Sequence, residues 1–512
     1  MKTTYKFLLL LGLVSFLVAG CTKDFEEINT DPNKAISVPT YALLTNAQFQ
    51  FSTNMFDAWW GGRQSMLWSQ YWSQNNYTDE DRYSIRQNTN SGYWRTFYLI
   101  TTDLEEIIKI NNDPEKKDLV SAYASNANQI ATAMIMKAWI VQHLTDLYGD
   151  IPYSQAWMGT EGNFLPAYDK QETIYKDVIA KLDAATAMIE VEGKGWAQGD
   201  IIYGGDMSKW KKFANSLKLR MAMRIKKVDA ALGTQLANEA LAAGVLESNA
   251  DNAVFQFLAS PPNNAPMWGA YNVDNRTDHS VTQQFVHLLK GVPVGGAEKV
   301  NPFAGLVDPR LPIFAQPVAD PTMLGEGIQG MPYGMDDNFT KQIGDKGASR
   351  PGTAILAADF AAIYMNYSEI AFIKSELNGW DQAEYENGVR ASLEYWGVAQ
   401  ADIDAFMAGL PAATQETVLT QKYIALYTQG YEAWSEYRRT GFPKTLVHPG
   451  EVTWKQADGT TVIFETLIGE DIPRRMTWPQ EEQTLNGSNY SAAVSAFGQA
   501  DAFESRVWWD KL

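Results

Sequence analysis

The residues best suited to hold a ligand lie in the segment 59–83, where aromatic rings alternate with amides and charged groups. Five of the 17 tryptophans fall in residues 59–98. A flat Trp or Tyr ring can stack on the apolar face of a sugar, while amide, carboxylate and guanidinium groups bond its hydroxyls. The mixture predicts glycan contacts from Trp68, Trp72, Asn76, Tyr77, Asp81 and Tyr83.

The same rings also have the spacing of a buried helix face. Trp68, Tyr71 and Trp72 are three and four residues apart and would point the same way on a helix. We therefore expect Trp68 or Trp72 to be partly packed and the end at 75–83 to be open. Farther along the chain, Trp268 and Tyr271 are candidates for an opposing wall of the same site.

Signatures of hydrolytic enzymes are missing from the sequence. It contains no G-x-S-x-G, no H-E-x-x-H and no G-x-x-x-x-G-K-[ST]. A glycosidase needs only two carboxylates, and 60 acidic residues give no reason to choose a pair. We expect a protein without enzymatic activity, with a surface glycosidase as an alternative.

Cofactor motifs are similarly sparse. Gly325, Gly327 and Gly330 match G-x-G-x-x-G, but loop-like sequence on both sides does not provide the strand and helix of a dinucleotide site. The four histidines are too scattered for a zinc cluster. We expect no cofactor; calcium is the alternative, because a loop offers oxygen ligands from Asp336, Asp337 and Asp345.

The first residues predict export and a lipid anchor. Lys2 and Lys6 precede an apolar run, as in a secretory signal peptide, and the run is too short to span a bilayer. Val-Ala-Gly followed by Cys21, the only cysteine, resembles a bacterial lipobox. We expect residues 1–20 to be removed and Cys21 to be acylated, which would attach the protein to the outer membrane, exposed at the cell surface.

The charge of the chain excludes one class of partner. The formal net charge is −18, and removal of a leader that carries two lysines and no acid makes it more negative. Such a chain repels phosphate backbones, so we expect no nucleic-acid partner.

Helical periodicity dominates two parts of the chain. One helix should end at Gly149, and Asp169 with Glu172 has the form of a capping box that opens another. The ranges with apolar residues at helical spacing are 130–148, 174–189, 210–225, 357–378, 382–396 and 419–437.

Between these parts, regular helices are interrupted. Eleven of the 21 prolines fall in residues 261–351. We expect a mostly α fold: a helical scaffold over about 40–245 and 356–445, a loop-rich ligand-binding insertion over about 246–355, and a C-terminal segment, 446–512. Together 21–512 would form one domain.

Four ordered motifs resemble landmarks of the SusD/RagB family, closest to a SusD-like branch with Arg-Arg and a terminal Trp-Trp. They are LTDLYGDIPY at 144–153, WKKFANSLKLRMAMRI at 210–225, QKYIALYTQGYEAWSEYRRTGFP at 421–443 and IPRRMTWPQEEQTLN at 472–486. Physically, Glu432 and Glu436 lie within two turns of Arg438 and Arg439, which favours an ion-pair cluster of the scaffold over a ligand clamp.

The resemblance implies tetratricopeptide-like helix pairs that support a loop-rich ligand surface. It also implies a cell-surface nutrient-binding lipoprotein that delivers its ligand to a TonB-dependent β-barrel transporter (SusC-like) and acts as its lid. The rings favour glycan, in the form of an oligosaccharide, as the ligand class. The alternative is that the protein binds an oligopeptide and is the lid of a peptide importer.

Overall fold

Helix α7, Asn126–Tyr148, is buried along most of its length. The side chain of Ser125 caps a backbone N–H of its first turn, and Gly149 ends it with a φ of 79°, which glycine adopts without strain. Helices α5, Gln87–Asn112, and α8, Gln171–Met188, both pack against α7. The predicted helix that ends at Gly149 is confirmed.

The computed structural model describes residues 38–57, 59 and 61–511. The leader and the predicted lipidation site Cys21 lie outside the described residues. From Thr40 onward the chain forms one compact unit. Among the described residues, no helix combines the length and the apolar character needed to cross a membrane.

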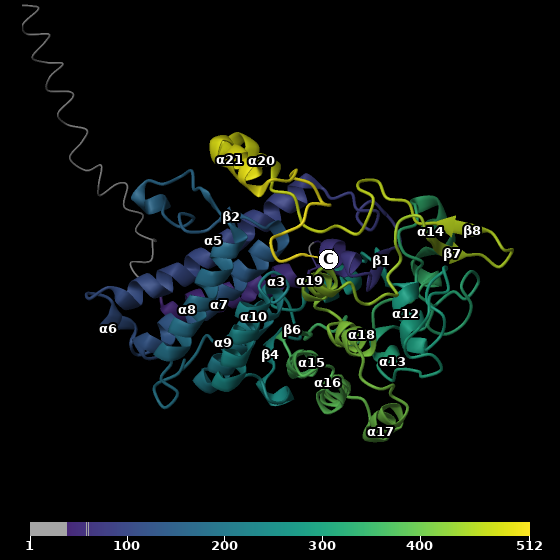
Figure 1. Ribbon diagram of the computed structural model, residues 1–512, viewed down its shortest axis with the longest axis horizontal. Helices are drawn as coiled ribbons and strands as arrows, with labels where there is room; N and C mark the ends of the chain where they lie inside the picture. Colours follow the sequence, from purple (N-terminus) through teal and green to yellow (C-terminus); the bar gives the residue numbers. More distant parts are fainter. Residues whose placement is uncertain (1–37, 58, 60, 512) are drawn as a thin grey trace, which may run out of the picture. The chain divides into compact units, whose positions relative to one another are not determined.

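Helices that are adjacent in the sequence pack as pairs, both before and after the insertion in the chain. This arrangement confirms the mostly α class (Figure 1). The first group adds α3 (Thr40–Met55), α4 (Met66–Trp68), α6 (Lys117–Val120), α9 (Met207–Ile225) and α10 (Ala230–Ala243) to α5, α7 and α8. The second contains α15 (Tyr367–Leu377), α16 (Gln382–Tyr395), α17 (Gln400–Ala408), α18 (Gln415–Ala425) and α19 (Gly430–Thr440).

Short paired strands connect the insertion to this scaffold. Strand β4, Ala253–Gln256, pairs antiparallel with β6, Ala361–Met365, and so joins the two ends of the insertion. Strand β1, Trp72–Gln74, pairs antiparallel with β5, His279–Val281, and thereby fixes the aromatic segment against the insertion. The two parts of the predicted ligand surface are therefore in direct contact.

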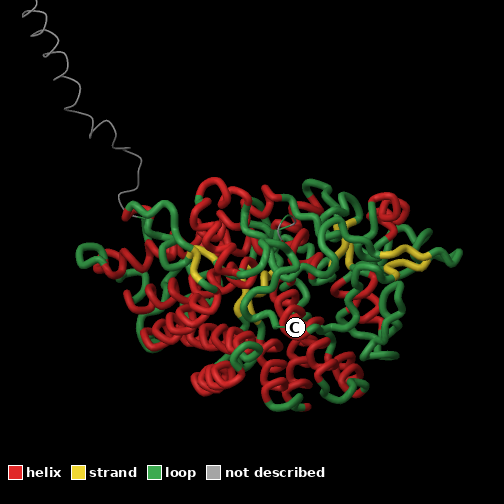
Figure 2. Tube along the Cα trace, turned by 45° about the horizontal axis from the view of Figure 1, so that its top comes forward, coloured by secondary structure: helices red, strands yellow, loops and turns green. Residues whose placement is uncertain are grey.

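Loops make up most of the insertion, and Figure 2 shows loops gathered on the side of the compact unit that carries it. Its helices are α11 (Pro266–Asn272), α12 (Gln283–Lys290), α13 (Leu311–Phe314) and α14 (Asp337–Gly347). The remaining regular elements are β2 (Ile151–Pro152), β3 (Tyr168–Asp169), β7 (Val452–Lys455), β8 (Thr461–Ile463), α20 (Gln480–Leu485) and α21 (Gly487–Phe497).

Two local expectations are wrong. The carboxylate of Asp169 accepts the backbone N–H of Ser154 at 2.7 Å, whereas the N–H that opens α8 at Gln171 donates to Asp150 at 2.8 Å. The capping carboxylate therefore comes from a distant part of the chain. The expected helix over 357–378 begins only at residue 367, because residues 361–365 pair with β4 as a strand.

The four family-like motifs meet at Asp146 in the core. Arg224 donates to Asp146 at 2.6 Å and to Glu432 at 2.7 Å. The indole N–H of Trp509 donates to the other carboxylate oxygen of Asp146 at 2.8 Å. Arg438 donates to the backbone oxygens of Asp146 and Arg474 at 2.8 and 3.0 Å. These motifs therefore build the scaffold.

A second buried cluster completes the ion-pair network. Arg439 contacts Glu436 at 2.8 Å within α19 and Glu376 of α15 at 2.7 Å. Lys422 of α18 contacts Glu436 at 2.8 Å. Of the predicted cluster at the end of α19, the Glu436–Arg439 pair is confirmed, whereas Glu432 pairs with arginines of α9 and Arg438 bonds backbone oxygens and Ser435.

Candidate ligand-binding site

Most of the rings selected from the sequence lie in the core, which corrects the expectation of an open face. Trp68 packs edge-on against Trp434, with ring centroids 4.9 Å apart. Trp72 donates its indole N–H to the hydroxyl of Tyr427 at 2.9 Å, and Tyr83 is buried. The rings do not share the expected helix face, because α4 ends at Trp68 and Trp72 begins strand β1; instead Trp434 of α19 covers Trp68 and Phe464 of the C-terminal segment covers Tyr83.

Two other selected residues are buried between the aromatic segment and the insertion. Asp81 accepts the Ser73 hydroxyl at 2.8 Å, and burial raises its pKa to about 7. Tyr271 donates its hydroxyl to the backbone oxygen of His279 at 2.5 Å. Asp81 therefore bonds within the aromatic segment and Tyr271 within the insertion, and neither side chain faces solvent.

Three of the selected residues remain accessible. Tyr77 is 51% exposed, and Asn76 and Trp268 are half-buried. Tyr77 has a left-handed backbone with a φ of 58°, a conformation that costs energy for a residue other than glycine and recurs at ligand sites. Ligand contact by these three residues stays a prediction.

A surface pocket of about 200 Å³ lies between the aromatic segment and the insertion. Trp59, 47% exposed, forms part of its wall, and the guanidinium carbon of Arg63 lies 4.1 Å from the ring centroid. The other lining residues come from the insertion: Ala270, Asp274, Arg276, Asp278 and His279. The pocket thus combines one accessible ring with charged groups.

Ion pairs hold the arginines of this pocket in place. Arg63 donates to the buried carboxylate of Glu80 at 2.9 Å. Arg276 contacts Asp278 at 2.8 Å, and its guanidinium carbon lies 5.6 Å from the centre of the Trp59 ring. Paired in this way, the charges can bond a neutral ligand's hydroxyls without attracting ions strongly.

His279 adds a neutral polar group to the pocket wall. Burial lowers its pKa to about 4, so the imidazole is uncharged at neutral pH. Its buried Nε2 has no hydrogen-bond partner among the described residues.

An unusual turn positions Arg63. Residues Gly61–Ser65 form one π-helical turn, a feature that occurs frequently at functional sites. A Cβ on Gly61 would lie 2.8 Å from the backbone oxygen of Met55, so a larger residue here would displace the turn. The turn places Arg63 where it contacts both Trp59 and Glu80.

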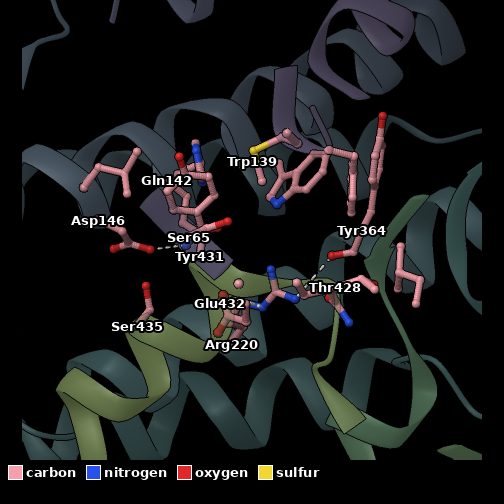
Figure 3. Close-up of a pocket in the computed structure, with 17 residues that line it drawn as sticks. Ser65, Trp139, Gln142, Asp146, Arg220, Tyr364, Thr428, Tyr431, Glu432 and Ser435 are labelled. Atoms are coloured by element: carbon pink, nitrogen blue, oxygen red, sulfur yellow. Dashed lines mark hydrogen bonds and ion pairs between the residues drawn. The ribbon is translucent and has the colours of Figure 1, made fainter. Parts of the chain in front are cut away.

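A separate cavity lies inside the scaffold (Figure 3). Asp146, Arg220 and Glu432 project toward it from three helices. Its volume is about 30 Å³, which suits a buried water molecule and is far too small for a sugar ring. We assign it to the polar core of the scaffold.

The three acids of the alternative calcium site do not converge. Asp336 caps the first turn of α14, Asp337 pairs with Lys341 at 2.9 Å, and Asp345 pairs with Arg350 at 2.6 Å. In the described part of the chain, no three His, Cys, Asp or Glu side chains are placed to bind a metal ion together.

The helical scaffold with its loop-borne pocket defines a class of ligand-binding proteins. A family model described as "Starch-binding associating with outer membrane" matches residues 32–479. The chain therefore belongs to the SusD-like family. A comparison with curated proteins found no match.

Solved structures of the same fold cover nearly the whole chain. A chitin-binding protein is 28% identical with a TM-score of 0.74 and covers 92% of this chain and 100% of its own. A chitin-binding SusD homolog from Flavobacterium johnsoniae is 25% identical with a TM-score of 0.70, covering 92% and 98%. A SusD homolog from Parabacteroides distasonis is 23% identical with a TM-score of 0.74, covering 92% and 98%.

Proposed function

We propose that this protein binds glycan in the pocket beside Trp59. The observation that carries the proposal is the accessible ring of Trp59 next to paired Arg and Asp groups, since sugars need both an apolar platform and hydroxyl partners. Two structural relatives bear the name chitin-binding, which supports an oligosaccharide ligand.

The proposal includes that the bound glycan is not cleaved. Membership of the SusD-like family and the absence of hydrolytic sequence signatures support this part of the proposal. Release of shorter products by rigorously purified protein would contradict it.

Replacing Trp59 by alanine tests the pocket. We expect the affinity to fall by about 1–3 kcal/mol, roughly tenfold or more, by analogy with base–aromatic stacking. The melting temperature should fall less than for a fully buried tryptophan, because about half of the side chain stays exposed in the folded protein. Calorimetric titrations with N-acetylchitohexaose and maltoheptaose, together with thermal melts, measure both quantities.

Phe164 provides the matched control, because its ring is 78% exposed and lies outside the pocket. Phe164→Ala should bind as the wild type does. If Trp59→Ala and the wild type bind with equal affinity, the ligand site does not include Trp59. Binding of short peptides alone would favour the oligopeptide alternative.

Attachment to the outer membrane through Cys21 is part of the same proposal. Cys21→Ala should shift the protein from the membrane fraction to a soluble form, because the acyl chains would have no attachment point. Cell fractionation measures the shift. A variant that stays in the membrane at wild-type level would contradict the lipobox interpretation.

We also propose that the protein delivers its ligand to a TonB-dependent β-barrel transporter and acts as its lid. The family resemblance supports this role. The intact lipoprotein should co-purify with a large barrel after gentle detergent extraction. Repeated extraction of the lipoprotein without any barrel would argue strongly against the lid role.

A further inference from the structure

The two adjacent tryptophans near the C-terminal end of the described chain have different environments. Trp509 is completely buried and bonds Asp146. Trp508 is only half-buried, and its ring meets Tyr175 edge-on at 5.9 Å. Trp508 thus packs partly against the core, and part of its ring stays accessible, unlike that of Trp509.

Trp508 lines a surface groove of about 560 Å³, the size range of small-molecule sites. The groove lies between the start of α8 and the segment from α21 to the C-terminal residues. Phe497, also half-buried, adds a second ring to its wall. It shares no lining residue with the pocket beside Trp59.

Unsatisfied polar groups accompany these rings. Gln171 is fully buried in the groove wall; its amide N–H donates to the Thr145 backbone oxygen at 2.6 Å, which fixes Oε1 as an acceptor without a partner among the described residues. The ammonium groups of Lys170 and Lys511 form no ion pair within the described part of the chain. The groove wall thus contains one fully buried acceptor, and its lining includes two exposed ammonium donors.

The charges at the groove disfavour a simple anion site. Asp150 accepts the N–H that opens α8 and so occupies the place where an anion would bind. Asp510 is neutralised by Arg474 at 2.7 Å and Arg506 at 2.8 Å. Ligand hydroxyls, which both donate and accept, match this mixture better than phosphate does.

We propose that this groove is a second saccharide-binding site, with Trp508 as its stacking platform and with Lys170 and Lys511 as hydroxyl partners. The proposal rests on the proposed glycan-binding function and adds a site to it. A glycan chain long enough to reach both places would gain affinity through two contacts.

Separate signals from the two rings test this inference. The protein is labelled with 5-fluorotryptophan, and the resonances of Trp59 and Trp508 are assigned with the Trp59→Phe and Trp508→Phe variants. Titration with N-acetylchitohexaose or maltoheptaose should shift both resonances. Calorimetry should show two sites in the wild type and one in Trp508→Ala, while Trp508→Phe keeps a weakened second site.

The outcomes separate the two proposals. A shift of the Trp59 resonance alone, with one site in both wild type and Trp508→Ala, overturns the second site and leaves the proposed function intact. A shift of the Trp508 resonance alone supports saccharide binding in the groove and contradicts saccharide binding in the pocket beside Trp59. No shift of either resonance with either saccharide overturns both. Thermal melts of Trp508→Phe establish that the fold is unchanged.

Discussion

Replacing Arg224 by alanine is expected to lower the free energy of unfolding by about 3–5 kcal/mol, because it leaves buried charges without their partner. Arg224 is fully buried and contacts Asp146 and Glu432. Burial opposes ionisation of Glu432, yet the neighbouring arginines lower its pKa, so this carboxylate depends on them for its charge. Urea denaturation followed by circular dichroism measures the loss.

An exposed ion pair provides the control for this prediction. Arg350 and Asp345 lie 2.6 Å apart, but both side chains are 36% exposed. Arg350→Ala should therefore cost less than about 1 kcal/mol. If both arginine variants lose the same stability, the network around Asp146 does not have the structural role assigned to it here.

The scaffold was largely predictable because its signals are local. Apolar periodicity defined α7, and the glycine that ends it adopts a backbone suited to that position. Errors arose where tertiary contacts override the local sequence. Asp150 replaces Asp169 as the cap of α8, and pairing with β4 turns residues 361–365 into a strand. A single sequence does not indicate such distant partners.

The candidate site was predictable as a region and not residue by residue. Sequence reasoning indicated contact between the aromatic segment and the insertion, and β1 with β5 provides it. It selected rings interleaved with amides and charged groups, and most of these rings are buried: Trp68, Trp72, Tyr83 and Tyr271. Trp59 was not among the selected rings, and its accessibility is visible only in the folded structure. Arg276 and Asp278 are brought to it only by the fold.

Replacing Trp68 by alanine is expected to cost about 3–5 kcal/mol of stability, because its ring is fully buried against Trp434 and Phe503 and a cavity would remain. Below the lowered melting temperature, the affinity for N-acetylchitohexaose should equal that of wild type, since the ring has no exposed face.

Tyr77→Ala, which removes an exposed ring from the same segment, should leave the melting temperature nearly unchanged. Thermal melts and titrations well below the transition measure these quantities. Normal melting of Trp68→Ala together with weakened binding would mean that Trp68 contacts ligand and that the packing described here is wrong.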